Sequence, residues 1–352
     1  MCIRDSKKVF LGALALVCAL ATAGLGFTGP GTVLLAVVLL FIANVAFSLG
    51  DNFCASFLPE ISTHDNVGRI SAYGWAFGYC GGLLSLIGAL VLIRGLPEDG
   101  VRASFFMTGL FFVLAVLPTL LLLRERARPL PLAASAAIAA SFGRLRQTWG
   151  ELRQHRALAI FLLAFFFYIA GLSAVFAFAA IVASSRYGFN QIEIIAVFAA
   201  LQVSAALGAL AFGWWQDRVG ARPVLLASLL GWILVSLAVA FLESKPAFWV
   251  IACAAGLVMG STQSASRAVV SLLTPAGRSG EFFGFWGLAG KLAAVVGPLV
   301  FGLVAELLSL PMAALANALF FVLGLVILLA FVPWPAATTT GRRSAAVAGS
   351  DP

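Results

Sequence analysis

The sequence predicts an all-α polytopic membrane protein, built from two pseudo-symmetric bundles of helices. Three observations support this fold class: an extreme composition, repeated apolar stretches of membrane length, and an internal repeat. Of the 352 residues, 62% are hydrophobic and only 10% are charged. So few polar side chains cannot cover the surface of a water-soluble protein of this length, so the surrounding solvent is expected to be lipid.

Apolar stretches of roughly 20 residues cross a bilayer as helices, at about 1.5 Å of rise per residue. Helices satisfy their own backbone hydrogen bonds, which lipid cannot do for them. The sequence holds ten such stretches, four before a long polar segment and six after it. We expect membrane helices near residues 9–27, 31–49, 70–93, 103–123, 157–183, 191–214, 223–241, 247–264, 283–304 and 312–333.

The polar segment from residue 124 to residue 156 is rich in arginine and predicts a linker between two bundles. Four parts of the chain follow from this division. We expect an incomplete N-terminal bundle of about four helices (1–123), a cytoplasmic linker (124–156), a C-terminal six-helix bundle (157–335) and a cytoplasmic tail (336–352).

Basic residues are unevenly shared between alternate joints, and Lys and Arg tend to stay on the cytoplasmic side. The side opposite to the linker holds only Arg94, Arg102, Arg186 and Lys245. The linker side carries Lys7, Lys8, Arg69, Arg218, Arg222, Arg267, Arg278, Arg342 and Arg343. The net charge of +8 is therefore interpreted as a signal of topology, and no nucleic-acid partner is expected because there is no basic soluble domain.

An internal repeat relates the two halves. Residues 70–76 (ISAYGWA) resemble residues 283–289 (FGFWGLA) at an offset of 213 positions, and both segments follow a polar joint. The first helix is then the partner of the one near 223–241, so we expect the first bundle to lack two helices that would precede Met1. The alternative, a secretory signal peptide ending near Ala21-Thr22-Ala23, does not explain the repeat.

Residues 213–222 (GWWQDRVGAR) resemble the loop signature G-x-x-x-D-R-x-G-x-[RK] of the major facilitator superfamily. The matching residues are Gly213, Asp217, Arg218, Gly220 and Arg222. Gly213 would let two helices approach closely, Gly220 would permit a tight turn, and Asp217 would accept hydrogen bonds from a helix N-terminus beside a guanidinium. The resemblance implies a major facilitator fold whose cytoplasmic gate is held by this motif; an ordinary polar turn is the alternative.

A narrower resemblance covers residues 56–61, 68–79 and 263–291. Together they are similar to the vacuole-effluxer branch, whose fungal members are associated with amino-acid export from the vacuole. The pair Cys54-Ala55 departs from the Tyr-Asn pair that is frequent in that branch. The resemblance implies a secondary active transporter of a small solute, with amino-acid efflux as the specific candidate, in the vacuolar membrane of a fungus or the inner membrane of a prokaryote. A non-transporting receptor or scaffold with the same fold is the alternative.

Five polar side chains in or beside the predicted spans are candidates for binding the substrate or a coupling ion: Lys291, Gln202, Asn44, Asp51 and Gln263. Lys291 is the strongest candidate, because an ammonium inside the membrane is costly and its helix face is rich in small residues. Its alternatives are a structural ion pair or a side chain that reaches the headgroups. For Gln202 and Asn44 the alternative is a hydrogen bond between helices, and for Asp51 it is plain contact with water.

The sequence carries no pattern typical of an enzyme. The pair Gly290-Lys291 lacks the other residues of a phosphate loop, so no ATP hydrolysis is expected. Five cysteines and two histidines lack the spacing of metal or redox sites. We therefore expect no cofactor and no metal. The expected partners are a small-molecule substrate, protons as the candidate coupling ion, and the lipid bilayer. The chain itself is expected to be monomeric.

Overall fold

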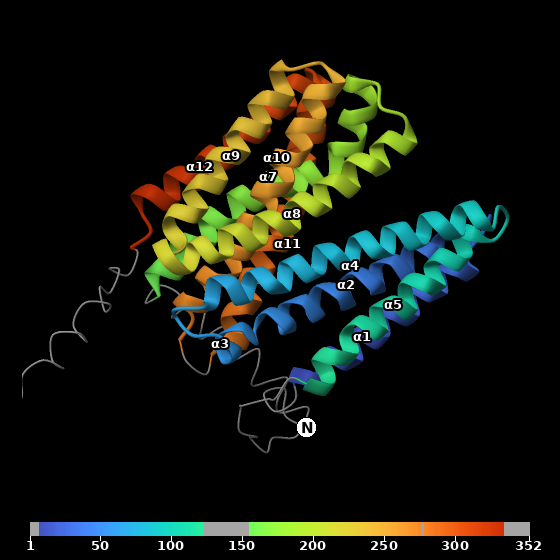
Figure 1. Cartoon of the computed structure of the whole chain (residues 1–352), viewed down its shortest axis with the longest axis horizontal. Helices are drawn as coiled ribbons and strands as arrows, with labels where there is room; N and C mark the ends of the chain where they lie inside the picture. The colour runs from blue at the N-terminus through green and yellow to red at the C-terminus, as the bar shows by residue number, and fades with distance from the viewer. Residues whose placement is uncertain (1–6, 123–154, 276–277, 334–352) are drawn as a thin grey trace, which may run out of the picture.

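The computed structural model describes residues 7–122, 155–275 and 278–333, and almost all of them are helical (Figure 1). Ten helices in these residues are long and apolar enough to cross a membrane, which confirms the expected helices. Linker and tail lie outside the described residues, except for the last two linker residues. The first four membrane helices are α1 (Lys7–Gly24), α2 (Val33–Ala55), α4 (Val67–Gly95) and α5 (Gly100–Leu122), with short turns η1 (Leu25–Phe27) and α3 (Leu58–Ile61).

Six membrane helices follow in the second described part of the chain. They are α7 (Arg156–Tyr187), α8 (Gln191–Val219), α9 (Ala221–Phe241), α10 (Lys245–Leu273), α11 (Ser279–Leu307) and α12 (Leu310–Ala330). Local signals fix several of their ends. Gly188 ends α7 in the left-handed conformation, with φ of 65°. Asn190 begins α8 with a capping box, in which its side chain accepts from the backbone N–H of Glu193 and that carboxylate accepts from its own N–H.

Several helices are longer than the sequence predicts. The expected spans 247–264 and 283–304 lie within α10 and α11, which extend nine residues further at the end of α10 and begin four residues earlier in α11. The sequence estimate stopped where polar residues begin. These polar residues continue the helices because they face protein rather than lipid, and most of residues 261–271 are buried.

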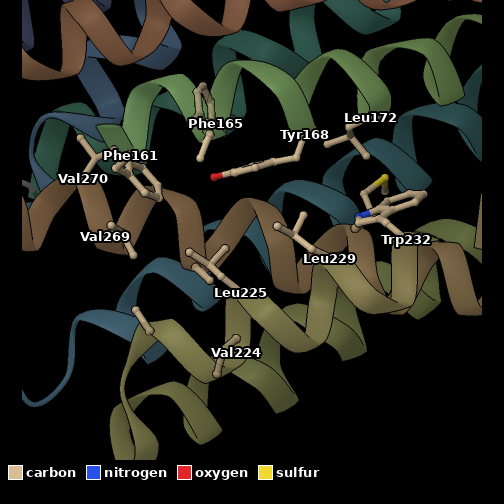
Figure 2. Packing of buried hydrophobic residues seen from close by; sticks show 14 of the residues in the cluster. Phe161, Phe165, Tyr168, Leu172, Val224, Leu225, Leu229, Trp232, Val269 and Val270 are labelled. Carbon is tan, nitrogen blue, oxygen red and sulfur yellow. The ribbon is translucent and has the colours of Figure 1, made fainter. Parts of the chain in front are cut away.

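The core of the second bundle is made of aromatic and branched side chains from α7, α9 and α10. Figure 2 shows Phe165 and Tyr168 of α7 across from Leu225 and Leu229 of α9. In lipid such packing gains little from the hydrophobic effect, so helix association depends on van der Waals contact and hydrogen bonds. Glycines bring the backbones together: a Cβ at Gly260 of α10 would overlap the carbonyl oxygen of Ala205 in α8.

Helix contacts in the first bundle mirror those in the second. Contacts join α1 to α2 and α5, and α4 to α5; the equivalent contacts join α9 to α10 and α12, and α11 to α12. Between the bundles, α4 meets α10 and α11 meets α2. These two contacts exchange when α4 is matched to α11 and α2 to α10, as the repeat requires. The pattern is that of two pseudo-symmetric halves.

The bundles are joined on the linker side, where α2 ends and α4 begins. Residues 68–82 of α4 meet the second bundle, whereas Gly88, further along the same helix, packs against Met107 of its own bundle. Figure 1 shows the beginning of α4 beside α8 and the ribbons of the two bundles diverging toward the turn between α4 and α5. The contacts between the bundles are therefore concentrated at the end where α4 and α11 begin, which is the linker side of the sequence prediction.

The close approach of α8 and α10 leads to a stability prediction. Gly260→Ala should destabilise the protein, because the added methyl group meets backbone of α8 and overpacking costs about 1–3 kcal/mol. Thermal unfolding in detergent measures the effect. Gly284→Ala is the matched control in another helix, since a Cβ there meets no atom within 4 Å. Equal unfolding midpoints for Gly260→Ala and the unchanged protein would contradict this account of the packing.

Candidate functional site

The junction between the bundles is built around Arg267 of α10. Its Nε donates to Ser71 Oγ at 3.1 Å, and its Nη2 donates to the backbone oxygen of Ser71 at 2.6 Å. The guanidinium also lies over the ring of Trp75, with its carbon 5.5 Å from the ring centroid. Gly74 makes this approach possible, because a Cβ there would lie 2.6 Å from Nη2. Arg267 is thus held entirely by α4, a helix of the other bundle.

Two further hydrogen bonds extend this contact along α4 and α10. Ser71 Oγ donates to the backbone oxygen of Ser264 at 2.8 Å, and the hydroxyl of Tyr79 donates to Gln263 Oε1 at 2.9 Å. Ser264 and Tyr79 are buried and Gln263 is half-buried. The sequence candidate Gln263 is therefore part of the seam between the bundles.

Asp51 and Lys291 lie beside this seam, and both are exposed although they belong to membrane helices. Lys291 is the thirteenth of the 29 residues of α11, so it lies near the middle of that helix. Asp51, four residues before the end of α2, is within electrostatic range of both Lys291 and Arg267. In the part of the chain that the structure describes, no ion pair holds either Asp51 or Lys291. One carboxylate thus lies within electrostatic range of two cations without forming a direct ion pair with either of them among the described residues.

The remaining two polar candidates lie apart from these charges. Gln202 of α8 is half-buried against α4, where the absence of a side chain at Gly82 makes room for its amide. Asn44 is exposed and donates to the backbone oxygen of Leu40 in its own helix, at 3.0 Å. Gln202 therefore makes a contact between α8 and α4.

The loop motif at the end of α8 forms a second contact between the bundles. Asp217 accepts hydrogen bonds from the backbone N–H groups of Gly68 (2.8 Å) and Arg69 (3.2 Å), at the N-terminus of α4. The Arg69 guanidinium lies 3.7 Å from the same carboxylate. Both contacts have the form expected from the sequence, because an anion is stabilised by the unpaired N–H groups and dipole of a helix start.

The other motif residues have different surroundings. Gly213 packs directly against Ala72 of α4, which a side chain would prevent, and Gly220 has φ of 88° between α8 and α9. Arg218 and Arg222 are exposed. Among the described residues no hydrogen bond or ion pair joins either arginine to a neighbouring helix end, so the polar contact of this motif with the other bundle is the one between Asp217 and the start of α4.

Sequence reasoning missed Arg267 and Ser71 as site residues. Arg267 was expected to mark only the topology, because the span was ended at residue 264. Two signals were present: Arg267 belongs to the segment that resembles the vacuole-effluxer branch, and the internal repeat matches Gly74 to Gly287. Each of these glycines accommodates a polar side chain from the opposite bundle, Arg267 at Gly74 and Asn52 at Gly287.

Comparison with known sequences identifies the family. Residues 3–342 match the profile of the family described as vacuole effluxer Atg22 like. The chain belongs to this family. Among the relatives, an uncharacterized MFS-type transporter of Bacillus subtilis, YxiO, is 28% identical over 96% of this chain and 80% of its own length. Autophagy-related protein 22 of Coccidioides immitis is 24% identical over 85% of this chain, which spans 63% of that relative.

Solved structures show the same fold at low sequence identity. The human organic anion transporter MFSD10 superposes with a TM-score of 0.73 at 17% identity, over 93% of this chain and 78% of that one. The Escherichia coli fucose:proton symporter FucP gives 0.70 at 16% identity, over 92% and 83% of the two chains. These similarities confirm the major facilitator fold. This Atg22-like chain is a multi-pass membrane transporter of the MFS type and not an enzyme.

The contact at Asp217 yields a prediction about transport. Asp217→Asn keeps an oxygen that can accept from α4 but removes the charge that holds Arg69 and the helix dipole. The linker side should then open more readily, so the transport rate should change more than the equilibrium affinity for substrate. Flux into proteoliposomes and binding in detergent measure the two quantities.

Glu193→Gln is the matched control, since Glu193 is an acidic residue of the same helix but lies in its first turn and pairs with Lys245 inside one bundle. Its transport rate should stay close to that of the unchanged protein. If the Asp217→Asn variant transported at the unchanged rate, Asp217 would not act as a latch.

Proposed function

We propose that this chain exports a small zwitterionic solute, with amino acids as the specific class, by alternating access of one site between the bundles. The observation that supports the proposal is the proximity of three charged residues, Asp51, Arg267 and Lys291, of which Asp51 and Lys291 are exposed. They come from α2, α10 and α11, so both bundles contribute to the same group of charges. A solute held there contacts both halves and can respond to their relative movement.

The charges match the two ends of a zwitterion. A substrate carboxylate is attracted by the ammonium of Lys291 and by the part of the Arg267 guanidinium that does not bind Ser71, and a substrate ammonium is attracted by Asp51. Because Asp51 and Lys291 are not paired with one another, binding does not have to break an existing salt bridge. A neutral sugar would leave these charges without partners, which disfavours it.

The contacts on the linker side support alternating access as the mechanism. Arg267 and Asp217 bind α4 across the junction, and both contacts consist of hydrogen bonds that separate without breaking the core of either bundle. Opening of the linker side then requires a rocking of two preformed bundles. Each monomer encloses a complete site, so we propose that the monomer is the transporting unit.

Proton coupling is the proposed source of energy. Asp51 can gain or lose a proton, and its charge state changes the balance with Arg267 and Lys291. A proteoliposome with an imposed pH gradient tests this part: coupled transport accumulates solute against its gradient, whereas facilitated diffusion stops at equal concentrations. A receptor or scaffold with this fold would move no solute in either assay.

Lys291→Met tests the site itself. The variant should bind a transported amino acid about tenfold to a hundredfold more weakly, because a charge-assisted hydrogen bond contributes about 1.5–3 kcal/mol. Binding of the analogue whose carboxylate is replaced by an uncharged amide should change far less. Equilibrium binding to the purified protein measures both affinities, and a panel of amino acids in the flux assay selects the ligand.

Lys245→Met is the matched control, since Lys245 pairs with Glu193 at the far end of the same bundle. It should leave both affinities unchanged. If folded Lys291→Met bound the amino acid and its amide as the unchanged protein does, Lys291 would not belong to the site. A panel in which no amino acid is transported would exclude the proposed substrate class.

A further inference from the structure

A second space lies inside the C-terminal bundle, in the half away from the linker. It is a largely apolar cavity with a volume of about 80 Å³, and all six helices of the bundle contribute to its lining. Aromatic rings, alanines and branched apolar side chains form almost all of the wall. Representative residues are Phe178, Phe248, Ala252, Phe301 and Ala314.

This cavity is separate from the charged site between the bundles. On α10, its lining residue closest to the linker side is Ala255, which precedes Arg267 by twelve residues, or roughly 18 Å of helix. No charged residue lines it. A ligand in this space would therefore be neutral, and it would not compete directly with a zwitterion at Lys291.

Two side chains in the cavity wall each hold a polar atom that has no hydrogen-bond partner among the described residues. Ser236 of α9 and Asn317 of α12 are each only 3% exposed, and neither Ser236 Oγ nor Asn317 Oδ1 is bonded to another group. Buried polar atoms are normally paired because burial without a partner is costly. These two atoms are therefore positioned to bind a group that enters the cavity.

The positions of Ser236 and Asn317 place them side by side. One helical turn closer to the linker side, Trp232 of α9 and Phe321 of α12 stack with ring centroids 5.2 Å apart and planes at 7°. Ser236 follows Trp232 by four residues and Asn317 precedes Phe321 by four, so both extend the same contact by one turn. Unlike Ser236 Oγ and Asn317 Oδ1, the indole N–H of Trp232 has a partner, because it donates to Thr262 Oγ1 at 3.0 Å.

Size and polarity determine what fits. A water molecule needs about 10–15 Å³ of such volume and two to four polar partners. The cavity has room for several waters, but its wall offers too few polar atoms to satisfy them. A single molecule with an apolar body and one polar group fills the space and uses both side chains.

We propose that this cavity is a binding site for a neutral, mainly apolar molecule that carries one hydroxyl group, of about the size of an aromatic alcohol. The hydroxyl donates to Asn317 Oδ1 and accepts from Ser236 Oγ, while the ring packs against Phe178 and Phe248. The site does not depend on the identity of the transported solute.

Binding of 4-fluorobenzyl alcohol to the full chain in detergent, followed by ¹⁹F NMR, tests the proposal. A bound signal should appear and saturate with ligand concentration. Ser236→Ala should weaken the alcohol about fivefold, which corresponds to a hydrogen bond of about 1 kcal/mol, and should leave 4-fluorotoluene unchanged. Ala252→Phe, which fills the cavity from α10, should abolish the bound signal of both ligands.

Ala314→Leu fills the same space from α12 and serves if Ala252→Phe does not fold. Ala211→Phe is the matched control, because Ala211 of α8 is exposed and outside the cavity. The absence of a saturable signal in the unchanged protein would overturn the proposal, as would a signal that survives in both filled variants. Equal weakening of alcohol and toluene by Ser236→Ala would overturn the assigned hydrogen bond.

Discussion

A guanidinium among membrane helices must find its hydrogen-bond partners in protein, because lipid offers none. Arg267 finds them on α4, in the backbone oxygen and hydroxyl of Ser71 and in the ring of Trp75. The helix that carries Arg267 is packed backbone to backbone against α8. Exposure of the Arg267 guanidinium to lipid would be costly. Its contacts with α4 therefore determine where the first bundle packs against the second.

The pseudo-symmetry of the halves places two equivalent contacts at this junction, and the side chains that make them differ in charge. Gly74 of α4 receives the charged side chain of Arg267, whereas the matching Gly287 of α11 receives the neutral amide of Asn52. Asp51 precedes Asn52 on α2, and Lys291 lies one turn beyond Gly287 on α11. The neutral contact is thus the one that lies next to Asp51 and Lys291 in the sequence of the two helices.

Much of the fold was predictable from the sequence, because membrane helices leave a strong signal. The ten helices and the contact of Asp217 with a helix start follow from hydropathy and from a single loop motif. The ends of α10 and α11 did not follow, since polar side chains buried against another bundle resemble a solvated joint. Arg267 was placed in such a joint, and its role became visible only when α10 was found to continue six residues beyond it.

The candidate site was predictable only in part. Lys291 and Asp51 were recognisable as costly polar groups, but nothing in a single sequence states that helices separated by more than 200 residues bring them near one another. The cavity that Ser236 and Asn317 help to line left no local signal, since the rest of its wall consists of ordinary apolar residues from six helices. Sites formed by the meeting of several helices need the three-dimensional arrangement.

We expect transport to require that the bundles separate on the linker side. Cysteines at Ser71→Cys and Ser264→Cys, in a chain without its native cysteines, test it through a short thiol cross-link across α4 and α10, where the Ser71 hydroxyl lies 2.8 Å from the Ser264 backbone oxygen. Ser228→Cys with Ser261→Cys, whose hydroxyl oxygens are 2.6 Å apart within the second bundle, is the matched control. We expect the first cross-link to stop flux until it is reduced, and the second to leave flux unchanged. Undiminished flux in the protein that carries the first cross-link would contradict this requirement.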